Sequence, residues 1–317
     1  MSTAVHRPSA PSADTVEAAA AAAGVTLVRT RGEVRAWVAG QRAAGRRVGL
    51  VPTMGYLHAG HLSLVDRARE RADVVAMSIF VNPLQFGPTE DLERYPRNLE
   101  GDLALAGGRG TELVFAPPVA EMYPHGEPRV SVLPDEEIGG RLDGGSRPGH
   151  FRGVLTVVAK LFGIFTPHVA VFGQKDWQQA TLIRRMAADL DMGVEVDVAP
   201  IVREADGLAM SSRNVYLSRD ERASALALSR SLRKAGELYA AGQREAAVLR
   251  AALWEGLGAP GVEPEYAEVA DPDTLAPVRE AAPGTLLAVA ARVGRTRLID
   301  NALLPRRDET NAQRIDS

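Results

Sequence analysis

The sequence predicts an α/β protein in which a parallel sheet is followed by a smaller α+β unit. Nearly continuous apolar runs at residues 48–53, 74–81 and 168–172 are typical of buried parallel strands. Segments with helical spacing of apolar residues separate these runs, as in doubly wound folds. After about residue 202 the pattern changes to amphipathic helices followed by short strands. These three observations together predict the fold class.

The first part of the chain is expected to alternate between helices and strands. Its predicted helices lie at residues 32–44, 62–69, 99–106, 154–162 and 177–190. Its predicted strands lie at residues 48–53, 74–81, 112–116, 129–133, 168–172 and 194–202. The segment Gly139–Gly153 contains six glycines, and we expect it to be too flexible to form a regular element.

The second part is expected to open with a helix capped by Ser218, because acidic residues follow this serine in the first turn. A second helix is predicted at residues 244–257, and Gly294–Thr296 is predicted to form a hairpin turn. The strands are predicted at residues 265–269, 286–290 and 297–301. The predicted divisions are a disordered leader at 1–24, a first domain at 25–201, a second domain at 202–304 and a disordered tail at 305–317.

Composition limits the classes of partner. A net charge of −3 and a pI near 6.1 give no general attraction to nucleic acid or to an anionic membrane, so we expect a small-molecule substrate. The absence of cysteine excludes disulfides, thiolate metal sites and a cysteine nucleophile. No segment reaches the roughly 18 apolar residues of a membrane helix, and residues 1–24 lack the pattern of a signal peptide. We expect a cytoplasmic protein.

His58 and His61 are the first candidates for a functional role. They lie three residues apart where a predicted turn enters a helix, so both project from one side of its first turn. Free N–H groups and the helix dipole favour phosphate at such a position, and Gly60 permits close approach of a ligand. Imidazoles there can donate hydrogen bonds to a triphosphate. The alternative is that one histidine caps the helix and the other is a surface residue.

Later segments offer further groups for an anionic ligand. Lys175 follows a predicted strand directly and can meet a phosphate as a compact charge. Asp176 is either the N-cap of the next helix or a partner for a ribose hydroxyl. Ser211, Ser212 and Arg213 can hold a pyrophosphate through hydroxyl, backbone and guanidinium donors.

Two loops allow a functional and a structural interpretation. Residues 82–97 follow a predicted strand in a long polar loop, where sites often gather, although the loop can equally be solvated. Arg147 and His150 lie in the glycine-rich segment before a helix and can face an anion. For that segment alone, a plain surface loop is the favoured interpretation.

Five motifs resemble the signature blocks of the pantoate–β-alanine ligase family, also known as pantothenate synthetases. They occur in the family's order and span residues 25–304. The motifs are Pro52-Thr-Met-Gly-x-Leu-His-x-Gly-His61, Ser78-Ile-Phe-Val-Asn-Pro-x-Gln-Phe86, Arg147-Pro-Gly-His-Phe-x-Gly-Val154, Gly173-Gln-Lys-Asp176 and Gly207-Leu-Ala-Met-Ser-Ser-Arg-Asn214. Five blocks in register are far more specific than any one of them.

The resemblance implies an AMP-forming ligase with a Rossmann-like nucleotidyltransferase domain and a C-terminal lid. The carboxylate of pantoate would attack the α-phosphorus of ATP to form pantoyl adenylate and pyrophosphate, and the amine of β-alanine would then displace AMP. Mg²⁺ bridging the phosphates and a homodimer are also implied.

The resemblance further implies roles for individual residues. His61 would be the proton donor, with His58 and Lys175 as further catalytic groups, and Gln85 and Gln179 would hold pantoate and β-alanine. The implied ATP-binding residues are Met54, Gly55, Tyr56, Leu57, His58, Ala59, Gly60, His61, Gly173, Gln174, Lys175, Asp176, Val202, Met210, Ser211, Ser212 and Arg213. Asp102 is a single carboxylate where some relatives have more, which weakens the prediction of a metal role for it. Position 174 is Gln where Glu is common in the family.

Two other functions remain open at this point. A nucleotidyltransferase that adenylylates a phosphorylated substrate would need an anion pocket where Gln85 and Gln179 lie. A non-catalytic nucleotide-binding module would hold ATP through the histidines and Lys175 without forming an adenylate. An aminoacyl-tRNA synthetase is disfavoured because the chain has no large basic RNA-binding domain.

Overall fold

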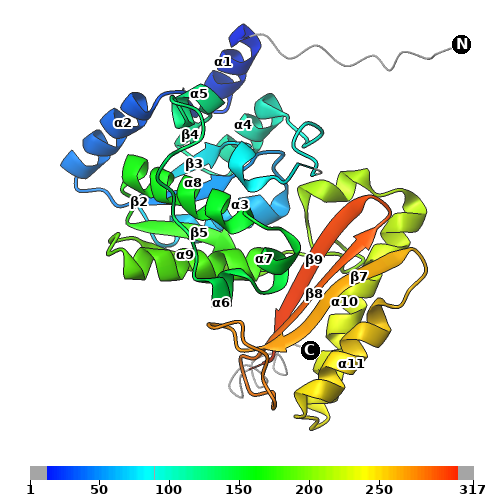
Figure 1. Cartoon of the computed structure of the whole chain (residues 1–317). Coiled ribbons are helices and arrows are strands. Elements are labelled where there is room, and N and C mark those ends of the chain that lie inside the picture. The colour runs from blue at the N-terminus through cyan, green and yellow to red at the C-terminus, as the bar shows by residue number, and fades with distance from the viewer. Residues whose placement is uncertain (1–12, 89, 306–317) are drawn as a thin grey trace, which may run out of the picture.

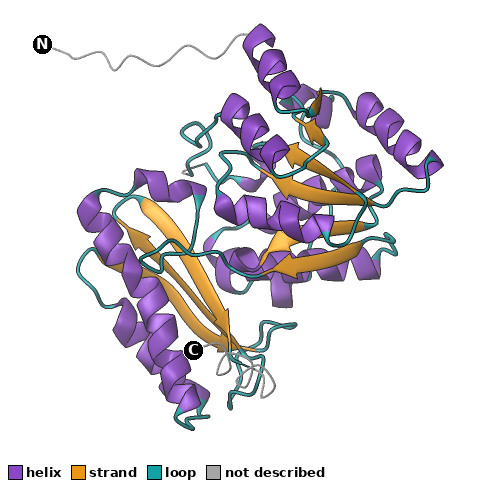
Figure 2. Ribbon diagram, turned by 180° about the vertical axis from the view of Figure 1, so that it is seen from behind, coloured by secondary structure: helices purple, strands orange, loops and turns teal. Residues whose placement is uncertain are grey.

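The structure, a computed structural model, describes residues 13–88 and 90–305. Within these ranges the strands form a six-stranded parallel sheet and a three-stranded antiparallel sheet, which lie side by side (Figures 1 and 2). The parallel strands are β1 (Thr26–Val28), β2 (Val48–Thr53), β3 (Val74–Ile79), β4 (Leu113–Phe115), β5 (Val169–Gly173) and β6 (Glu195–Ala199). The predicted fold class, a parallel α/β sheet followed by an α+β unit, is confirmed.

The strands of the parallel sheet lie in the order β1-β4-β3-β2-β5-β6. From β2 the chain moves outward through β3 and β4 and then returns to place β5 on the other side of β2. The strand order therefore reverses between β2 and β5, and open parallel sheets bind ligands outside the carboxyl ends of the strands at such a point.

Helices cover both faces of the parallel sheet. One face packs against α2 (Arg31–Ala43), α8 (His150–Phe165) and α9 (Trp177–Asp189). The other face packs against α1 (Ala13–Ala22), α3 (Ala59–Arg69) and α4 (Leu99–Gly108). The central strands are buried on both sides, which explains why their sequences are continuously apolar rather than alternating.

The antiparallel sheet consists of β7 (Val262–Ala270), β8 (Leu286–Val293) and β9 (Thr296–Leu303). Two helices, α10 (Arg219–Ala240) and α11 (Ala246–Leu257), pack on one face and bury a separate apolar core. Ser218 caps α10 as predicted, since its hydroxyl accepts a hydrogen bond from the N–H of Glu221. Gly294, with a φ of 57°, lies in the tight turn between β8 and β9. The domain boundaries at residues 25 and 202 remain predictions.

Part of the predicted disordered leader is ordered, so that prediction is wrong for residues 13–22. They form α1, whose Val16 and Ala20 are buried in the same core as α4. The alanine run favours a helix, and packing against α4 provides the stabilisation that a short helix lacks alone. Residues 1–12 and 306–317 lie outside the described residues, so their predicted disorder stays a prediction.

A strand predicted at residues 129–133 is a further error. These residues form no strand within the described chain, although the N–H of Val132 donates to the hydroxyl of Thr156. Val130 is 87% exposed and Leu133 67% exposed. The alternating pattern suits a strand, but no described strand pairs with the segment.

The glycine-rich segment also differs from the prediction. It includes the end of the short helix α6 (Glu136–Gly139), the helix α7 (Leu142–Ser146) and the start of α8. A Cβ atom at Gly144 would lie only 1.6 Å from the carbonyl oxygen of Gly139, so glycine serves close packing here rather than flexibility.

No helix within residues 13–88 and 90–305 combines the length and the apolar character needed to cross a bilayer.

Candidate active site

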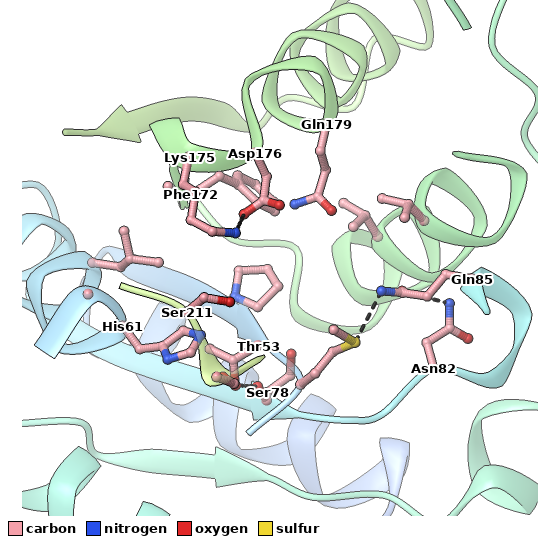
Figure 3. Close-up of a pocket in the computed structure, with 18 of the residues that line it drawn as sticks. Thr53, His61, Ser78, Asn82, Gln85, Phe172, Lys175, Asp176, Gln179 and Ser211 are labelled. Atoms are coloured by element: carbon pink, nitrogen blue, oxygen red, sulfur yellow. Dashed lines mark hydrogen bonds and ion pairs between the residues drawn. The ribbon is translucent and has the colours of Figure 1, made fainter. Parts of the chain in front are cut away.

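A cavity of about 220 Å³ lies at the carboxyl ends of β2 and β5, where the strand order reverses. The turn after β2, the loop after β3, helix α8, the turn after β5 and the segment after β6 all contribute to its lining. Figure 3 shows Lys175, Asp176 and Gln179 across the cavity from His61, Thr53 and Ser78. Segments far apart in the sequence therefore converge on one site.

The turn between β2 and α3 is held by a carboxylate from another helix. Gly55 and Tyr56 adopt positive φ angles of 84° and 53°. Asp102 of α4 accepts hydrogen bonds from the N–H groups of Tyr56, at 2.9 Å, and Leu57, at 2.7 Å. Its side chain is buried, and burial raises the pKa of Asp102. Because both carboxylate oxygens are bonded to the backbone, these contacts give Asp102 a structural part in the turn.

His58 and His61 form a packed pair at the start of α3. Their ring centroids are 4.0 Å apart, and His58 is the N-cap residue of the helix. Nδ1 of His58 accepts from the N–H of Gly60 at 3.2 Å, and Nδ1 of His61 accepts from the N–H of His58 at 3.4 Å. If both rings are neutral, each proton is then on Nε2, which is left to donate. The capping role considered for His58 and a role toward a ligand are therefore compatible.

The electrostatic surroundings keep both imidazoles uncharged. Burial, assisted by the positive charge of Lys175, lowers the pKa of His58 to about 4. Burial also lowers the pKa of His61 well below its usual range, and His58 and Lys175 act in the same direction. Both rings are therefore neutral hydrogen-bond donors near pH 7.

Lys175 lines the same cavity as the two histidines, as the sequence predicted. It lies in η2 (Gln174–Asp176), the short 3-10 turn that joins β5 to α9. Its Nζ atom is 3.6 Å from a carboxylate oxygen of Asp176. Asp176 occupies the N-cap position of α9 but makes no side-chain cap hydrogen bond. It lines the cavity instead.

Two glutamines line the part of the cavity beyond Lys175. Gln85 ends η1 (Pro83–Gln85), and its amide is held by Asn82 and by the sulfur of Met54, each at 3.1 Å. Gln179 lies in the first turn of α9, and its side chain makes no hydrogen bond to any described residue. One amide is therefore fixed in place and the other is available to a ligand.

The position of Gln85 depends on a close contact between η1 and α8. A Cβ atom at Gly153 would lie 2.2 Å from the carbonyl oxygen of Leu84, so any larger residue would push the two elements apart. Asn82 reinforces the contact by donating to the carbonyl of Gly153 at 3.1 Å, and Tyr123 donates to Asn82 at 2.8 Å. The last glycine of the third motif is thus a packing requirement.

The segment after β6 closes the cavity. The hydroxyl of Ser212 donates to the carbonyl of Tyr56 at 3.2 Å, which ties this segment to the turn after β2. Arg213 makes two hydrogen bonds of 2.9 Å to the carboxylate of Asp91. Met210 donates its N–H to the carbonyl of Val202 at 3.0 Å. Ser211, Ser212 and Arg213 line the same cavity as the histidine pair, and their phosphate role stays a prediction.

Arg147 and His150 line the cavity, so the favoured interpretation of their segment as a plain surface loop is wrong. Arg147 donates to the carboxylate of Glu90 at 2.6 and 2.7 Å and to the carbonyl of Gln85 at 3.2 Å. Burial, followed by the charge of Arg147, lowers the pKa of His150 to about 4. The polar loop at residues 82–97 supplies their partners and is likewise part of the site.

Most of the predicted residues line this cavity, although their catalytic and binding roles remain predictions. The lining includes Met54, His58, Gly60, His61, Gln85, Gly173, Lys175, Asp176, Gln179, Val202, Met210, Ser211, Ser212 and Arg213. The predicted residues outside the lining are Gly55, Tyr56, Leu57, Ala59, Asp102 and Gln174. These belong to, or support, the two turns that carry the lining residues.

A family model described as Pantoate-beta-alanine ligase matches residues 26–303. This chain belongs to the pantoate–β-alanine ligase family. The pantothenate synthetase of Pelotomaculum thermopropionicum is 55% identical over 279 residues, which cover 88% of this chain and 98% of the relative. The pantothenate synthetase of Anaeromyxobacter dehalogenans is 57% identical over 272 residues, which cover 83% of this chain and 93% of the relative.

Solved structures of the ligase family have the same fold. A pantothenate synthetase from Thermus thermophilus is 46% identical, with a TM-score of 0.84, and the match covers 89% of this chain and 100% of that one. A pantoate–β-alanine ligase from Francisella tularensis, complexed with an ATP ligand and β-alanine, is 30% identical with a TM-score of 0.71. That match covers 88% of this chain and 97% of the other.

Several residues of this ligase-family site were not predicted from the motifs. Ser78 and Asn82 lie inside the motif Ser78–Phe86, which predicted no role for either residue, and both line the cavity. Asn301 contacts the Lys175 turn from β9, more than 120 residues away in the chain. The motif around Ser78 was a usable signal for the first two, but no local pattern marks Asn301.

Proposed function

We propose that this protein condenses pantoate with β-alanine to form pantothenate, consuming ATP and releasing AMP and pyrophosphate. The carboxylate of pantoate attacks the α-phosphorus of ATP, which gives pantoyl adenylate and pyrophosphate. The amine of β-alanine then attacks the acyl carbon, forms the amide bond and releases AMP. One observation carries the proposal: a single cavity combines a phosphate-binding side, with two imidazoles and an ammonium, and an uncharged amide side suited to a hydroxy acid.

The phosphate side stabilises charge that develops during adenylation. His58 and His61 donate from Nε2 as neutral imidazoles, and Lys175 supplies a positive charge across the cavity. Attack on phosphorus needs little covalent help from a protein, so positioning and electrostatic stabilisation provide most of the acceleration. Arg213, whose Nη1 makes no hydrogen bond to a described residue, and the hydroxyl of Ser211 bind the leaving pyrophosphate, while Ser212 holds the segment against the turn after β2.

The amide side holds pantoate and then β-alanine. Gln179 has an unbonded side chain that can bond the hydroxyl and carboxylate groups of pantoate, while Gln85 is held in place by its neighbours. Neutral amides bind these groups without offering a competing nucleophile. A phosphorylated acceptor would need free cationic donors here, whereas all three nitrogens of the nearby Arg147 guanidinium already contact Glu90, His150 or the carbonyl of Gln85.

Mg²⁺ is proposed as the ion that accompanies ATP. Residues 13–88 and 90–305 contain no group of three or more His, Asp or Glu side chains suited to a metal ion. Magnesium commonly retains several waters and binds through substrate phosphates with few protein ligands, which fits this donor set. We therefore propose that the ion binds to the phosphates of ATP and that Asp102 is not one of its ligands, because this carboxylate accepts hydrogen bonds from the turn after β2.

The proposal also includes a homodimer in the cytoplasm. The exposed apolar side chains of Val130 and Leu133 offer a surface that a second copy can cover, and the absence of cysteine suits a reducing compartment.

The proposed function is tested by incubating the purified protein with ATP, Mg²⁺ and pantoate, with and without β-alanine. We expect pyrophosphate from ATP and pantoate, and AMP with the amide product when β-alanine is added. ATP binding without pyrophosphate release would favour the non-catalytic module. Adenylylation of a phosphorylated acceptor, with none of pantoate, would favour the other nucleotidyltransferase.

A further inference from the structure

Asn301 of β9 connects the antiparallel sheet with the turn that carries Lys175. Its side-chain Nδ2 donates to the carbonyl oxygens of Gln174 and Lys175, both at 2.9 Å. Its Oδ1 accepts from Nε2 of Gln174 at 3.2 Å. Only the nitrogen of an amide can donate to two carbonyls, so this network fixes the orientation of the side chain. The Asn301 amide therefore directs all three of these hydrogen bonds to η2.

Asn301 is itself rigidly held. Only 4% of its surface is exposed, and it pairs with Ala288 in the ladder between β8 and β9. Its N–H donates to the carboxylate of Asp300 at 2.8 Å. A buried side chain on a strand that is paired along its length has little freedom, so the turn that Asn301 contacts is held in place relative to β9.

The neighbouring Asp300 reaches the other side of the site. Arg203 donates to its two carboxylate oxygens at 2.7 and 2.9 Å. Arg203 precedes the Met210–Arg213 segment and also donates to the carbonyl of Gly207 at 3.1 Å. Two consecutive residues of β9 thus hold two of the segments that bring phosphate-binding side chains to the cavity, those of Lys175 and of Met210–Arg213.

We propose that Asn301 is a positioning residue for Lys175, so that the antiparallel sheet sets the place of the catalytic ammonium. The inference rests on the proposed adenylation function. Lys175 has a long, flexible side chain whose ion pair with Asp176 is 3.6 Å long, so the position of its Nζ atom depends on the backbone from which it extends. Two of the carbonyls that define that backbone are held by Asn301.

A double-mutant cycle between positions 301 and 175 tests the proposal. Pyrophosphate release from ATP, Mg²⁺ and pantoate is measured in a single turnover for the wild type, Asn301→Ala, Lys175→Ala and the double variant. Asn301→Ala is expected to lower the rate by on the order of 100-fold, the loss that a misplacement of about 1 Å can cause. In the Lys175→Ala background the same change is expected to have little further effect, because the group that it positions is absent.

Asn301→Asp and Val289→Ala complete the design. Asn301→Asp keeps the volume but replaces the donor with an acceptor facing two carbonyls, so its loss should equal or exceed that of Asn301→Ala. Val289 is buried in the helix-facing core of the same sheet, and Val289→Ala should lower Tm while leaving the rate of the folded enzyme unchanged. Equal fold-losses from Asn301→Ala with and without Lys175, or a near-normal rate in both Asn301 variants, would overturn the proposal.

Failure of the proposed function gives a different result. A wild-type protein that binds ATP but releases no pyrophosphate with pantoate contradicts the ligase function. The cycle is then measured on the Kd for ATP with Mg²⁺, where Asn301→Ala should weaken binding only when Lys175 is present. Equal weakening in both backgrounds would reject the role of Asn301 independently of the reaction.

Discussion

Replacing His61 with alanine should remove one neutral N–H donor from the phosphate side of the cavity. Because Nδ1 of His61 accepts from the N–H of His58, its Nε2 proton is the one directed to a ligand. Loss of a donor aimed at developing charge costs about 10²–10³-fold in rate, or about 2.7–4 kcal/mol. The folded state should lose about 1 kcal/mol, the cost of a weakened helix cap, so the protein remains folded.

The assay is the rate of pyrophosphate release from ATP and pantoate, with circular dichroism as a check of folding. His61→Gln retains a neutral donor and should recover part of the lost rate. His125, an exposed residue outside the cavity lining, provides the control, and His125→Ala should leave the rate unchanged. A rate for His61→Ala within a few fold of the wild type would refute the reasoning.

The pH dependence of the adenylation rate provides a second check on the imidazoles of His58 and His61. Burial lowers the pKa of His58 to about 4 and lowers the pKa of His61 well below its usual range. Neither imidazole should therefore change charge as the pH passes through the range in which an ordinary imidazole titrates. The adenylation rate should show no inflection near the ordinary imidazole pKa of about 6.5, and an increase in rate as the pH falls through that value would mean that an imidazolium is the donor.

Three further predictions concern other residues of the site. Lys175→Ala should lower the adenylation rate by on the order of 100-fold with little change in Tm, because its ion pair with Asp176 is long and partly exposed; full activity would make it a surface lysine. Asp102→Asn leaves one N–H of the Tyr56–Leu57 turn without an acceptor and should cost about 1–3 kcal/mol of the free energy of unfolding, measured by urea denaturation. A loss of Mg²⁺ affinity at unchanged stability would instead indicate a metal ligand. Gln179→Ala should raise the KM for pantoate by up to about tenfold without affecting the KM for ATP, and the reverse pattern would contradict its assignment.

The site illustrates which parts of a functional arrangement are local in sequence. The turn from Thr53 to His61 and the turn at Gly173–Asp176 were both predicted as strand-to-helix connections, and the structure places both at the switch point. Each depends on a short apolar run, a turn residue and a helical period, which neighbouring residues encode by themselves. Their meeting in one cavity follows from the parallel sheet, because the carboxyl ends of its strands share one edge.

Other features depend on contacts between distant segments. The helix at residues 13–22 is ordered because α4 offers a surface for it, whereas the alternating pattern at residues 129–133 forms no strand, since no described strand pairs with it. Arg147 belongs to the site because Glu90 and Gln85 lie next to it, which its own glycine-rich segment does not reveal.

By itself, the sequence determined the order and type of most elements, the motifs and the small-molecule character of the substrate. The tertiary structure decided that Asp102 supports a turn, that Gly153 permits contact between α8 and η1, and that Asn301 holds the backbone of Lys175. The physical reason is the range of the interactions: periodicity and turn chemistry act over a few residues, whereas hydrogen bonds and close packing between segments exist only after the chain has brought them together.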